Sequence, residues 1–247
     1  MIKNNKIVIV MPAFFAEKTL EKTYKDIPEE YRRNVLVVDD ASKDNTANVS
    51  KKLGLKTIIH KNNLGYGGNQ KTCYKNALKM GADIIVMLHP DFQYDARMIP
   101  ALVRPIEIGW LDFTMGNRMR SRKESLDGGM PIYKYLFNRF LTIIENVLLG
   151  QNLGEFHSGF RAYSAKLLRT IPFEKFSNDF VFDQQFIVSA VNSGFKIGEV
   201  PVQVRYFPEA SSISFKRSIT YGFGALFTVL QYYLKRLGIS NPKIFKQ

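Results

Sequence analysis

Short apolar runs alternate with segments of helical periodicity along the first half of the chain. The apolar runs are typical of buried strands and lie at Ile7–Met11, Val35–Val38, Lys56–His60 and Ile84–Leu88. The segments between them have helical spacing and cover residues 17–26, 43–53 and 69–80. Strands that alternate with helices of this length predict an α/β fold with a mostly parallel, doubly wound sheet and helices on both faces.

The second half of the chain continues this pattern and ends in an uncharged segment. Strands are predicted at 112–118 and 196–207, and helices at 131–149 and from residue 180. Residues 218–234 carry no charge, lie between basic pairs, and are too few to span a bilayer, which takes about 20 apolar residues. They predict a helix in an anionic membrane interface, with a buried homodimer helix as the alternative. We expect a main domain over 1–210 and a helical appendage over 211–247.

Composition adds a preference for anionic partners. The 247 residues are 45% hydrophobic and 23% charged, as in ordinary globular proteins, and carry a net charge of +13. This charge favours nucleic acid, phosphorylated ligands or an acidic membrane surface. The single cysteine excludes an internal disulfide and a cysteine-rich metal cluster.

Polar side chains follow the strand that ends at Leu88. Ligands of open α/β sheets bind at the carboxyl ends of strands. Residues two apart in extended backbone point the same way, so Asp91 and Gln93 could face one hard cation, with His89 alongside. Such oxygen ligands suit Mg²⁺ or Mn²⁺ held jointly with a diphosphate. The alternative is that Asp91 only caps a following helix.

Two further strand ends carry candidate nucleotide contacts. The turn after the first strand contains no glycine, which argues against a dinucleotide-binding dehydrogenase. Asp39 and Asp40 lie at the same sheet edge and could accept hydrogen bonds from a base or a ribose, although Asp40 could instead cap a helix. The glycine-rich stretch 62–69, which includes Gly68, would let backbone approach a ligand but is not a Walker loop.

These motifs together resemble a known family. Pro12-Ala13 with Glu17, the segment 38–46, Asn63-Leu64-Gly65 and the Asp91 motif are similar to family-2 glycosyltransferases with the GT-A fold. The chain is most similar to the branch of dolichol-phosphate mannosyltransferases and polyprenyl-phosphate glucosyltransferases, from about residue 6 to residue 221. The resemblance implies a nucleotide-diphosphate sugar donor, a divalent metal (Mg²⁺ or Mn²⁺) and inversion at the anomeric carbon.

The resemblance also implies roles for single residues. Asp91, Asp183, Arg118 and Arg205 would be catalytic, with the two arginines on an acceptor phosphate, and Asp91 and Gln93 would bind the metal. Donor-binding residues would be Pro12, Ala13, Phe14, Glu17, Asp39, Asp40, Gly68, His89 and Asp91. His89 replaces the first aspartate of the family's Asp-x-Asp motif. It either shifts the metal preference or, as we favour, contacts donor phosphate and leaves Asp91 as the sole carboxylate ligand.

Other basic and polar residues are not expected to take part directly in the chemistry. The cationic run that ends at Lys123 predicts a flexible loop, either a lid over substrate or simply solvated. Arg161, in a segment that resembles the family's Ser/Thr-Gly-Phe-Arg motif, is expected to be an internal ion-pair partner, and His157 to be structural. Gln185 stands where the family has a glutamate, so the sequence identifies no general base. A phosphate acceptor is already anionic at neutral pH and needs no strong base.

The expected function is transfer of a hexose from a UDP-glucose or GDP-mannose type donor to a polyprenyl phosphate. The enzyme would be peripheral on the cytoplasmic membrane face. A hydroxyl acceptor on a glycan or glycolipid is the alternative, and it would make Asp183 indispensable. A non-catalytic nucleic-acid-binding protein is a remote third interpretation. It is disfavoured because the basic residues are spread along the chain and no nucleic-acid motif is present.

Overall fold

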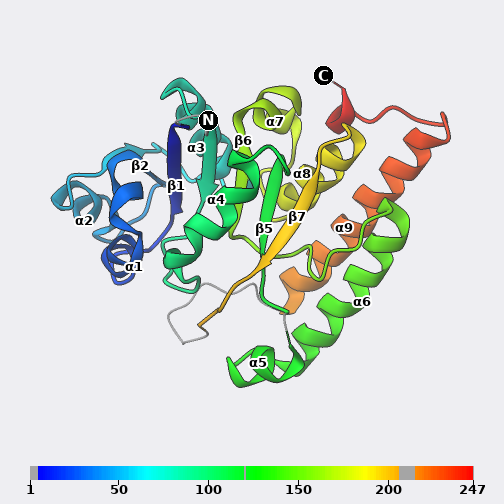
Figure 1. Cartoon of the computed structure of the whole chain (residues 1–247), viewed down its shortest axis with the longest axis horizontal. Helices are drawn as coiled ribbons and strands as arrows, with labels where there is room; N and C mark the ends of the chain where they lie inside the picture. The colour runs from blue at the N-terminus through cyan, green and yellow to red at the C-terminus, as the bar shows by residue number, and fades with distance from the viewer. Residues whose placement is uncertain (1–4, 120, 206–214, 247) are drawn as a thin grey trace.

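The computed structural model describes residues 5–119, 121–205 and 215–246. Within them, seven strands form one sheet in the order β3-β2-β1-β4-β6-β5-β7 (Figure 1). The strands are β1 (Ile7–Ala13), β2 (Val35–Asp39), β3 (Lys56–Ile59), β4 (Ile84–Met87), β5 (Phe113–Asn117), β6 (Arg161–Ser164) and β7 (Ile197–Pro201). The predicted α/β class and the mostly parallel sheet are confirmed.

One strand runs against the others. β6 pairs antiparallel with both β4 and β5, whereas β1, β2, β3 and β4 pair in parallel, as do β5 and β7. The sequence did not predict β6, because Arg161 and Ser164 at its two ends leave it without the apolar run that marks the other buried strands. The consequence for the site is that the carboxyl ends of β1, β2, β4 and β5 lie along one edge of the sheet.

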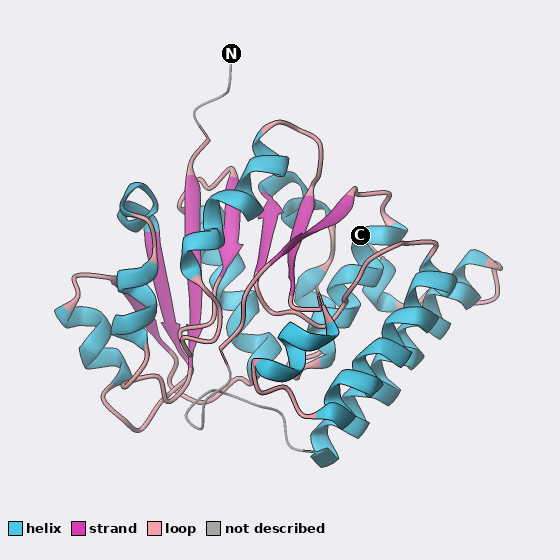
Figure 2. Cartoon of the chain, turned by 60° about the horizontal axis from the view of Figure 1, so that its bottom comes forward, coloured by secondary structure: helices cyan, strands magenta, loops and turns pink. Residues whose placement is uncertain are grey.

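Helices cover both faces of the sheet (Figure 2). Alternate residues of β1 point to opposite faces, as the pleat of a strand requires. Val8 and Val10 pack in the core cluster that includes α3 and α8, and Ile9 and Met11 in the cluster that includes α1 and α4. The helices are α1 (Leu20–Asp26), α2 (Thr46–Lys52), α3 (Tyr66–Lys79), α4 (Ile99–Glu107), α5 (Arg122–Asp127), α6 (Ile132–Leu149), α7 (Ala165–Thr170), α8 (Val181–Asn192) and α9 (Phe215–Arg236).

Helices α6 and α9 run side by side in the same direction along one flank of the molecule (Figures 1 and 2). Two glycines let α9 pack closely, because a Cβ on Gly222 would lie 2.5 Å from the Phe137 ring and one on Gly224 would lie 2.5 Å from Val181. The α9 helix is therefore held between α6 and α8. No helix among the described residues is long and apolar enough to cross a membrane. The predicted boundary at 210/211 lies outside the described residues.

The predicted flexible loop is a helix at its end. Arg122 and Lys123 form the first turn of α5, and the Ser121 side chain caps this helix by accepting from the Glu124 N–H. The positive charges of this segment are typical of a solvated loop, but the serine three residues before a glutamate is an N-cap signal and favours a helix.

Candidate active site

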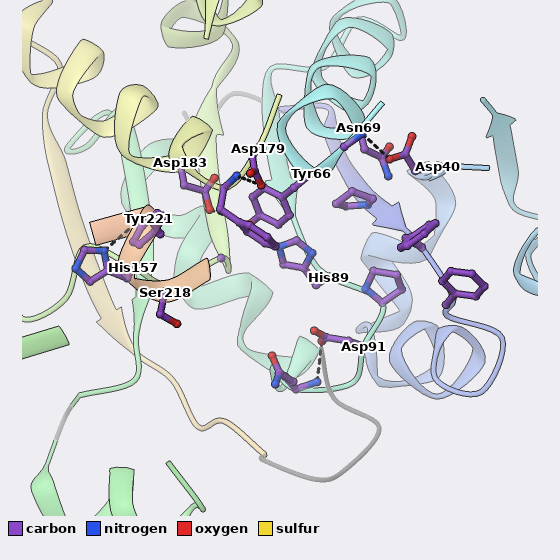
Figure 3. Close-up of a pocket in the computed structure, with 18 of the residues that line it drawn as sticks. Asp40, Tyr66, Asn69, His89, Asp91, His157, Asp179, Asp183, Ser218 and Tyr221 are labelled. Atoms are coloured by element: carbon purple, nitrogen blue, oxygen red, sulfur yellow. Dashed lines mark hydrogen bonds between the residues drawn. The ribbon is translucent and has the colours of Figure 1, made fainter. Parts of the chain in front are cut away.

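A cavity of about 1480 Å³ opens at the carboxyl ends of β1, β2, β4 and β5. The amino-terminal parts of α6 and α9 close its other side. Figure 3 shows Asp40 and Asn69 at one end, Tyr66, His89 and Asp183 in the middle, and His157, Tyr221 and Ser218 at the other end. The predicted convergence of strand ends on one site is therefore present, and the α6–α9 flank adds a second wall.

Most of the site residues that the sequence predicts line this cavity. The lining includes Pro12, Phe14, Asp40, His89, Asp91, Gln93, Arg118 and Asp183. Ala13, Glu17, Asp39, Gly68 and Arg205 are not part of the lining. Gly68 donates its N–H to the Asn178 carbonyl at 3.4 Å, and the other four have the contacts described below.

Three of the residues outside the lining hold the loops that follow β1 and β2. The buried Ala13 carbonyl accepts from the Asp40 N–H at 2.9 Å. The Asp39 carboxylate accepts from the Ser42 hydroxyl, and Glu17 accepts from the Asn45 N–H at 2.8 Å. These contacts fix the loops on which the lining residues lie.

Asp40 organises the glycine-rich loop. Its carboxylate accepts from His60 Nδ1 at 2.7 Å, from the Leu64 N–H at 2.8 Å and from the Gly65 N–H at 3.0 Å. Gly65 has a φ of 83°, which a residue with a side chain rarely adopts. The alternative in which Asp40 caps α2 is wrong, because that helix begins at Thr46. His60 was not predicted as a site residue, because its partner Asp40 lies 20 positions away in the sequence.

Asp91 and Gln93 lie on a turn. Phe92 has a φ of 61°, and the Asp91 carboxylate accepts from the Gln93 N–H at 3.1 Å. The extended backbone assumed from the sequence is therefore wrong, although both residues still border the cavity. The cap of the following 3₁₀ turn is Asp95, which accepts from the Arg97 N–H. Asp91 is thus not needed as a helix cap.

Tyr66, which the sequence reasoning missed, connects the middle of the site. Its hydroxyl donates to Asp183 at 2.8 Å and lies 3.1 Å from His89 Nε2, while its ring packs on Phe180 with centroids 4.6 Å apart. Burial lowers the pKa of His89, so the imidazole is neutral at pH 7. An aromatic residue between two glycines of the glycine-rich stretch was the available signal.

Arg161 forms a buried ion pair with Asp183. Its side chain is fully buried, pairs with the Asp183 carboxylate at 3.2 Å, and donates to the Ser158 carbonyl at 2.6 Å. Gln70 donates to the same carboxylate at 3.1 Å. The prediction that Arg161 is an internal ion-pair partner is confirmed.

The two arginines predicted for the acceptor phosphate lie in different places. Arg118 lines the cavity and donates through Nε to the buried Glu155 at 2.8 Å. Burial raises the pKa of Glu155, but Arg118 outweighs this effect and the net shift is downward. Arg205 instead pairs with Asp26 at 3.2 Å and stacks on Phe92, outside the lining.

A buried carboxyl group lies behind the α6–α9 wall. Glu145 has no exposed surface, and neither of its oxygens has a hydrogen-bond partner in the part of the chain that the structure describes. Its Oε2 lies 3.4 Å from His157 Nε2, and His157 Nδ1 lies 2.9 Å from the Tyr221 hydroxyl. Burial raises the pKa of Glu145 well above its ordinary value of 4.5. Burial also lowers the pKa of His157 to about 4.

Replacing Glu145 by Gln is expected to stabilise the protein, and by more at about pH 8 than at about pH 5. As the pH rises above 4.5, the unfolded chain releases the Glu145 proton while the folded chain retains it, so the wild type loses stability. Glutamine has no proton to release. Melting temperatures of both proteins across this range should diverge as the pH rises. A difference that stays constant would show that Glu145 titrates normally.

Comparison with known proteins is consistent with this geometry. Residues 8–171 match the model of Glycosyl transferase family 2. The chain is 31% identical to an uncharacterised protein of Methanocaldococcus jannaschii, over 93% of both chains. It is 28% identical to the UDP-N-acetylglucosamine–dolichyl-phosphate N-acetylglucosaminyltransferase of Methanococcus voltae, over 81% of this chain and 86% of the relative.

A solved structure shares the fold. Glucosyl-3-phosphoglycerate synthase of Mycobacterium tuberculosis, in complex with Mn²⁺, uridine diphosphate and phosphoglyceric acid, superposes with a TM-score of 0.70 at 17% identity. The match covers 96% of this chain and 80% of the synthase. Because the family model matches β1, β2 and β4 together with Asp40 and Asp91, and a cavity lies at the carboxyl ends of these strands, the chain belongs to glycosyltransferase family 2 and has the GT-A fold.

Proposed function

We propose that the protein transfers a hexose or N-acetylhexosamine from a UDP-linked donor to a polyprenyl phosphate, while bound peripherally to the cytoplasmic face of a membrane. The observation that carries the proposal is the continuity between the cavity and an exposed apolar face on α6 and α9. The Methanococcus voltae relative, whose name gives dolichyl phosphate as its acceptor, supports the same class of acceptor.

The apolar face follows one side of each helix. On α6 it consists of Ile132, Leu136, Phe140, Ile143 and Val147, and on α9 of Ile219, Phe223, Phe227 and Leu230. These side chains are 42–77% exposed and recur every three or four residues, as one helical stripe requires. Contiguous apolar patches of this kind on soluble proteins mark interaction surfaces.

Two observations favour a membrane as the partner of this face. Tyr133, Phe137 and Ile219 are exposed beside or within it and also line the cavity, so a lipid chain could lie on the face while its phosphate enters the site. The sequence contains no Asp or Glu after Glu209 but has six Lys and Arg residues there. An anionic bilayer complements both the apolar face and the positive charge.

The cavity wall suits a divalent metal shared with the donor. Within the described ranges, no group of three or more His, Cys, Asp or Glu side chains could hold a metal alone. Mg²⁺ in proteins often takes one or two carboxylates and completes its shell with waters and substrate phosphates. Asp91 would supply the carboxylate, with the Gln93 side chain beside it. Once bound, Mg²⁺ or Mn²⁺ would neutralise charge on the leaving diphosphate.

The sugar transfer itself involves the two substrates and the other residues that line the cavity. An oxygen of the acceptor phosphate attacks the anomeric carbon opposite the diphosphate, and the carbon–oxygen bond to UDP breaks as the new bond forms. This nucleophile is already anionic, so no strong general base is required. Arg118 would orient the attacking phosphate, while Tyr66 and Arg161 hold Asp183 beside the sugar. Positioning would supply most of the rate acceleration.

A transfer assay tests this function. The full chain is incubated with Mn²⁺ or Mg²⁺, a radiolabelled UDP- or GDP-sugar, and either a polyprenyl phosphate or the corresponding polyprenol. We expect label in the organic phase with the UDP-sugar and the phosphate only. Transfer to hydroxyl acceptors that disappears in Asp183→Asn would favour the alternative acceptor class. No transfer from any sugar nucleotide would refute the proposal.

Replacing Phe140 and Phe223 together by Asp is expected to weaken binding to anionic phospholipid vesicles by on the order of a hundredfold, because each loses roughly 1.5 kcal/mol of apolar transfer and adds a repelled charge. Vesicle co-sedimentation measures the effect. The control is Trp110→Asp, which alters a residue that is 71% exposed and lies outside the face. Unchanged vesicle binding together with conversion of a dimer into a monomer would identify the face as a homodimer interface instead.

A further inference from the structure

Three polar side chains from different parts of the chain form a line that ends at the cavity. Glu145 comes from α6, His157 from the loop before β6, and Tyr221 from α9. His157 Nε2 lies 3.4 Å from Glu145 Oε2, and Nδ1 lies 2.9 Å from the Tyr221 hydroxyl. Figure 3 shows His157 and Tyr221 joined at the end of the cavity that lies away from Asp40. Both residues belong to the cavity lining.

The surroundings of Glu145 favour its neutral acid. Among the described residues, His157 is the only basic side chain within ion-pair distance of Glu145. The other charges near His157 have partners of their own, since Arg118 pairs with Glu155 and Arg161 with Asp183. A fully buried carboxylate without a cation is strongly disfavoured. The group therefore keeps its proton and has an O–H to donate.

The position of this proton determines the tautomer of His157. Among the described residues, neither the Glu145 oxygens nor His157 Nε2 has a hydrogen-bond partner, and a small rotation of the carboxyl group would join one of its oxygens to Nε2. If Glu145 donates to Nε2, the neutral imidazole carries its proton on Nδ1. Nδ1–H then donates to the Tyr221 oxygen. The hydroxyl proton of Tyr221 is left to point into the cavity.

We propose that Glu145 and His157 are positioning residues that fix the Tyr221 hydroxyl as a hydrogen-bond donor to the phosphate of the acceptor. The proposal rests on the proposed function, because it assigns an anionic acceptor to this end of the cavity. Arg118 borders the same cavity and supplies the positive charge. A hydroxyl that must donate outward selects an anion, which accepts at every oxygen.

Tyr221→Phe tests the contact itself. A hydrogen bond to a charged group is worth enough that its loss should raise KM for the polyprenyl phosphate by about tenfold or more. KM for the sugar nucleotide should stay unchanged. The matched control is Tyr232→Phe on the same helix, whose ring packs near Phe245 and does not line the cavity. An acceptor KM unchanged in Tyr221→Phe would overturn the proposal.

Glu145 variants separate positioning from packing. Glu145→Leu keeps the volume and removes the donor, but it leaves the buried His157 Nε2 without a partner, so the melting temperature should fall only slightly. Its acceptor KM should nevertheless rise by about threefold to tenfold, because Tyr221 loses its fixed orientation. Glu145→Gln retains an N–H that can donate to Nε2 and should restore the wild-type KM. Equal acceptor KM values in all three proteins would show that Glu145 has only a structural role.

The tautomer can be observed in the wild-type protein. The chain has only three histidines, so ¹⁵N spectra of protein with labelled histidine can be assigned by single replacement. We expect His157 to be neutral with its proton on Nδ1. A proton on Nε2, or a charged ring at neutral pH, would overturn the proposal. If the wild type transfers no sugar to polyprenyl phosphate, the proposed function itself fails. If it does and Tyr221→Phe behaves as the wild type, only this inference fails.

Discussion

Replacing Asp91 by Asn is expected to lower kcat for sugar transfer by about a thousandfold or more. The substitution preserves the shape and the acceptor oxygen that holds the Gln93 N–H, but it removes the negative charge. Without that charge, a divalent cation shared with the donor diphosphate would lose its only carboxylate on the proposed site. Initial rates under saturating donor and acceptor measure the effect.

Donor binding gives a second measurement for the same variant. Mn²⁺ should tighten UDP binding to the wild type and have little effect on UDP binding to Asp91→Asn. The matched control is Asp112→Asn, which changes a carboxylate at the start of β5 that accepts from the Lys196 N–H, at the opposite edge of the sheet. Equal metal dependence in Asp91→Asn and the wild type would remove Asp91 from the metal site.

Replacing Arg161 by Met is expected to destabilise the protein by about 3–5 kcal/mol, because Asp183 would keep a largely buried charge without its counterion. The carbonyls of Phe156 and Ser158 would also lose a donor. For a chain of this length, the melting temperature should fall by on the order of 10 °C. Chemical or thermal unfolding measures the loss.

The double variant Arg161→Met with Asp183→Asn identifies the cause. If the uncompensated charge is responsible, the double variant should be more stable than the sum of the two single losses indicates. Arg169→Met, which changes an exposed arginine on α7, should stay within about 0.5 kcal/mol of the wild type. A loss below about 1 kcal/mol in Arg161→Met would contradict the role given to this ion pair.

The local pattern of the chain predicted most of the elements near the site. β1, β2 and β4 are apolar at almost every position because both faces of the sheet are covered, and such runs are visible in the sequence. β6, which begins at Arg161 and ends at Ser164, was missed, and α5 was taken for a loop. In both, the deciding interaction is a pairing or a cap rather than a repeated period.

The candidate site was predicted unevenly for a related reason. Pro12 lies at the carboxyl end of β1, and Asp40 and Asp91 follow strands that run parallel to it, so their convergence needed only the fold class. Arg205 is different, since its partner Asp26 lies 179 positions away and no local pattern indicates that pair. The contacts of Tyr66 could likewise not be predicted, because its partners His89 and Asp183 come from two other segments.

The order of the elements, the class of the sheet, and the edge at which its polar strand ends meet can all be inferred from the amino-acid sequence. These follow from the period of apolar residues and from the direction that parallel strands share. The folded chain was needed to learn which side chains face the cavity, which charges are neutralised, and how Glu145, His157 and Tyr221 line up. Those outcomes depend on contacts between residues far apart in the chain, whose energies no local pattern contains.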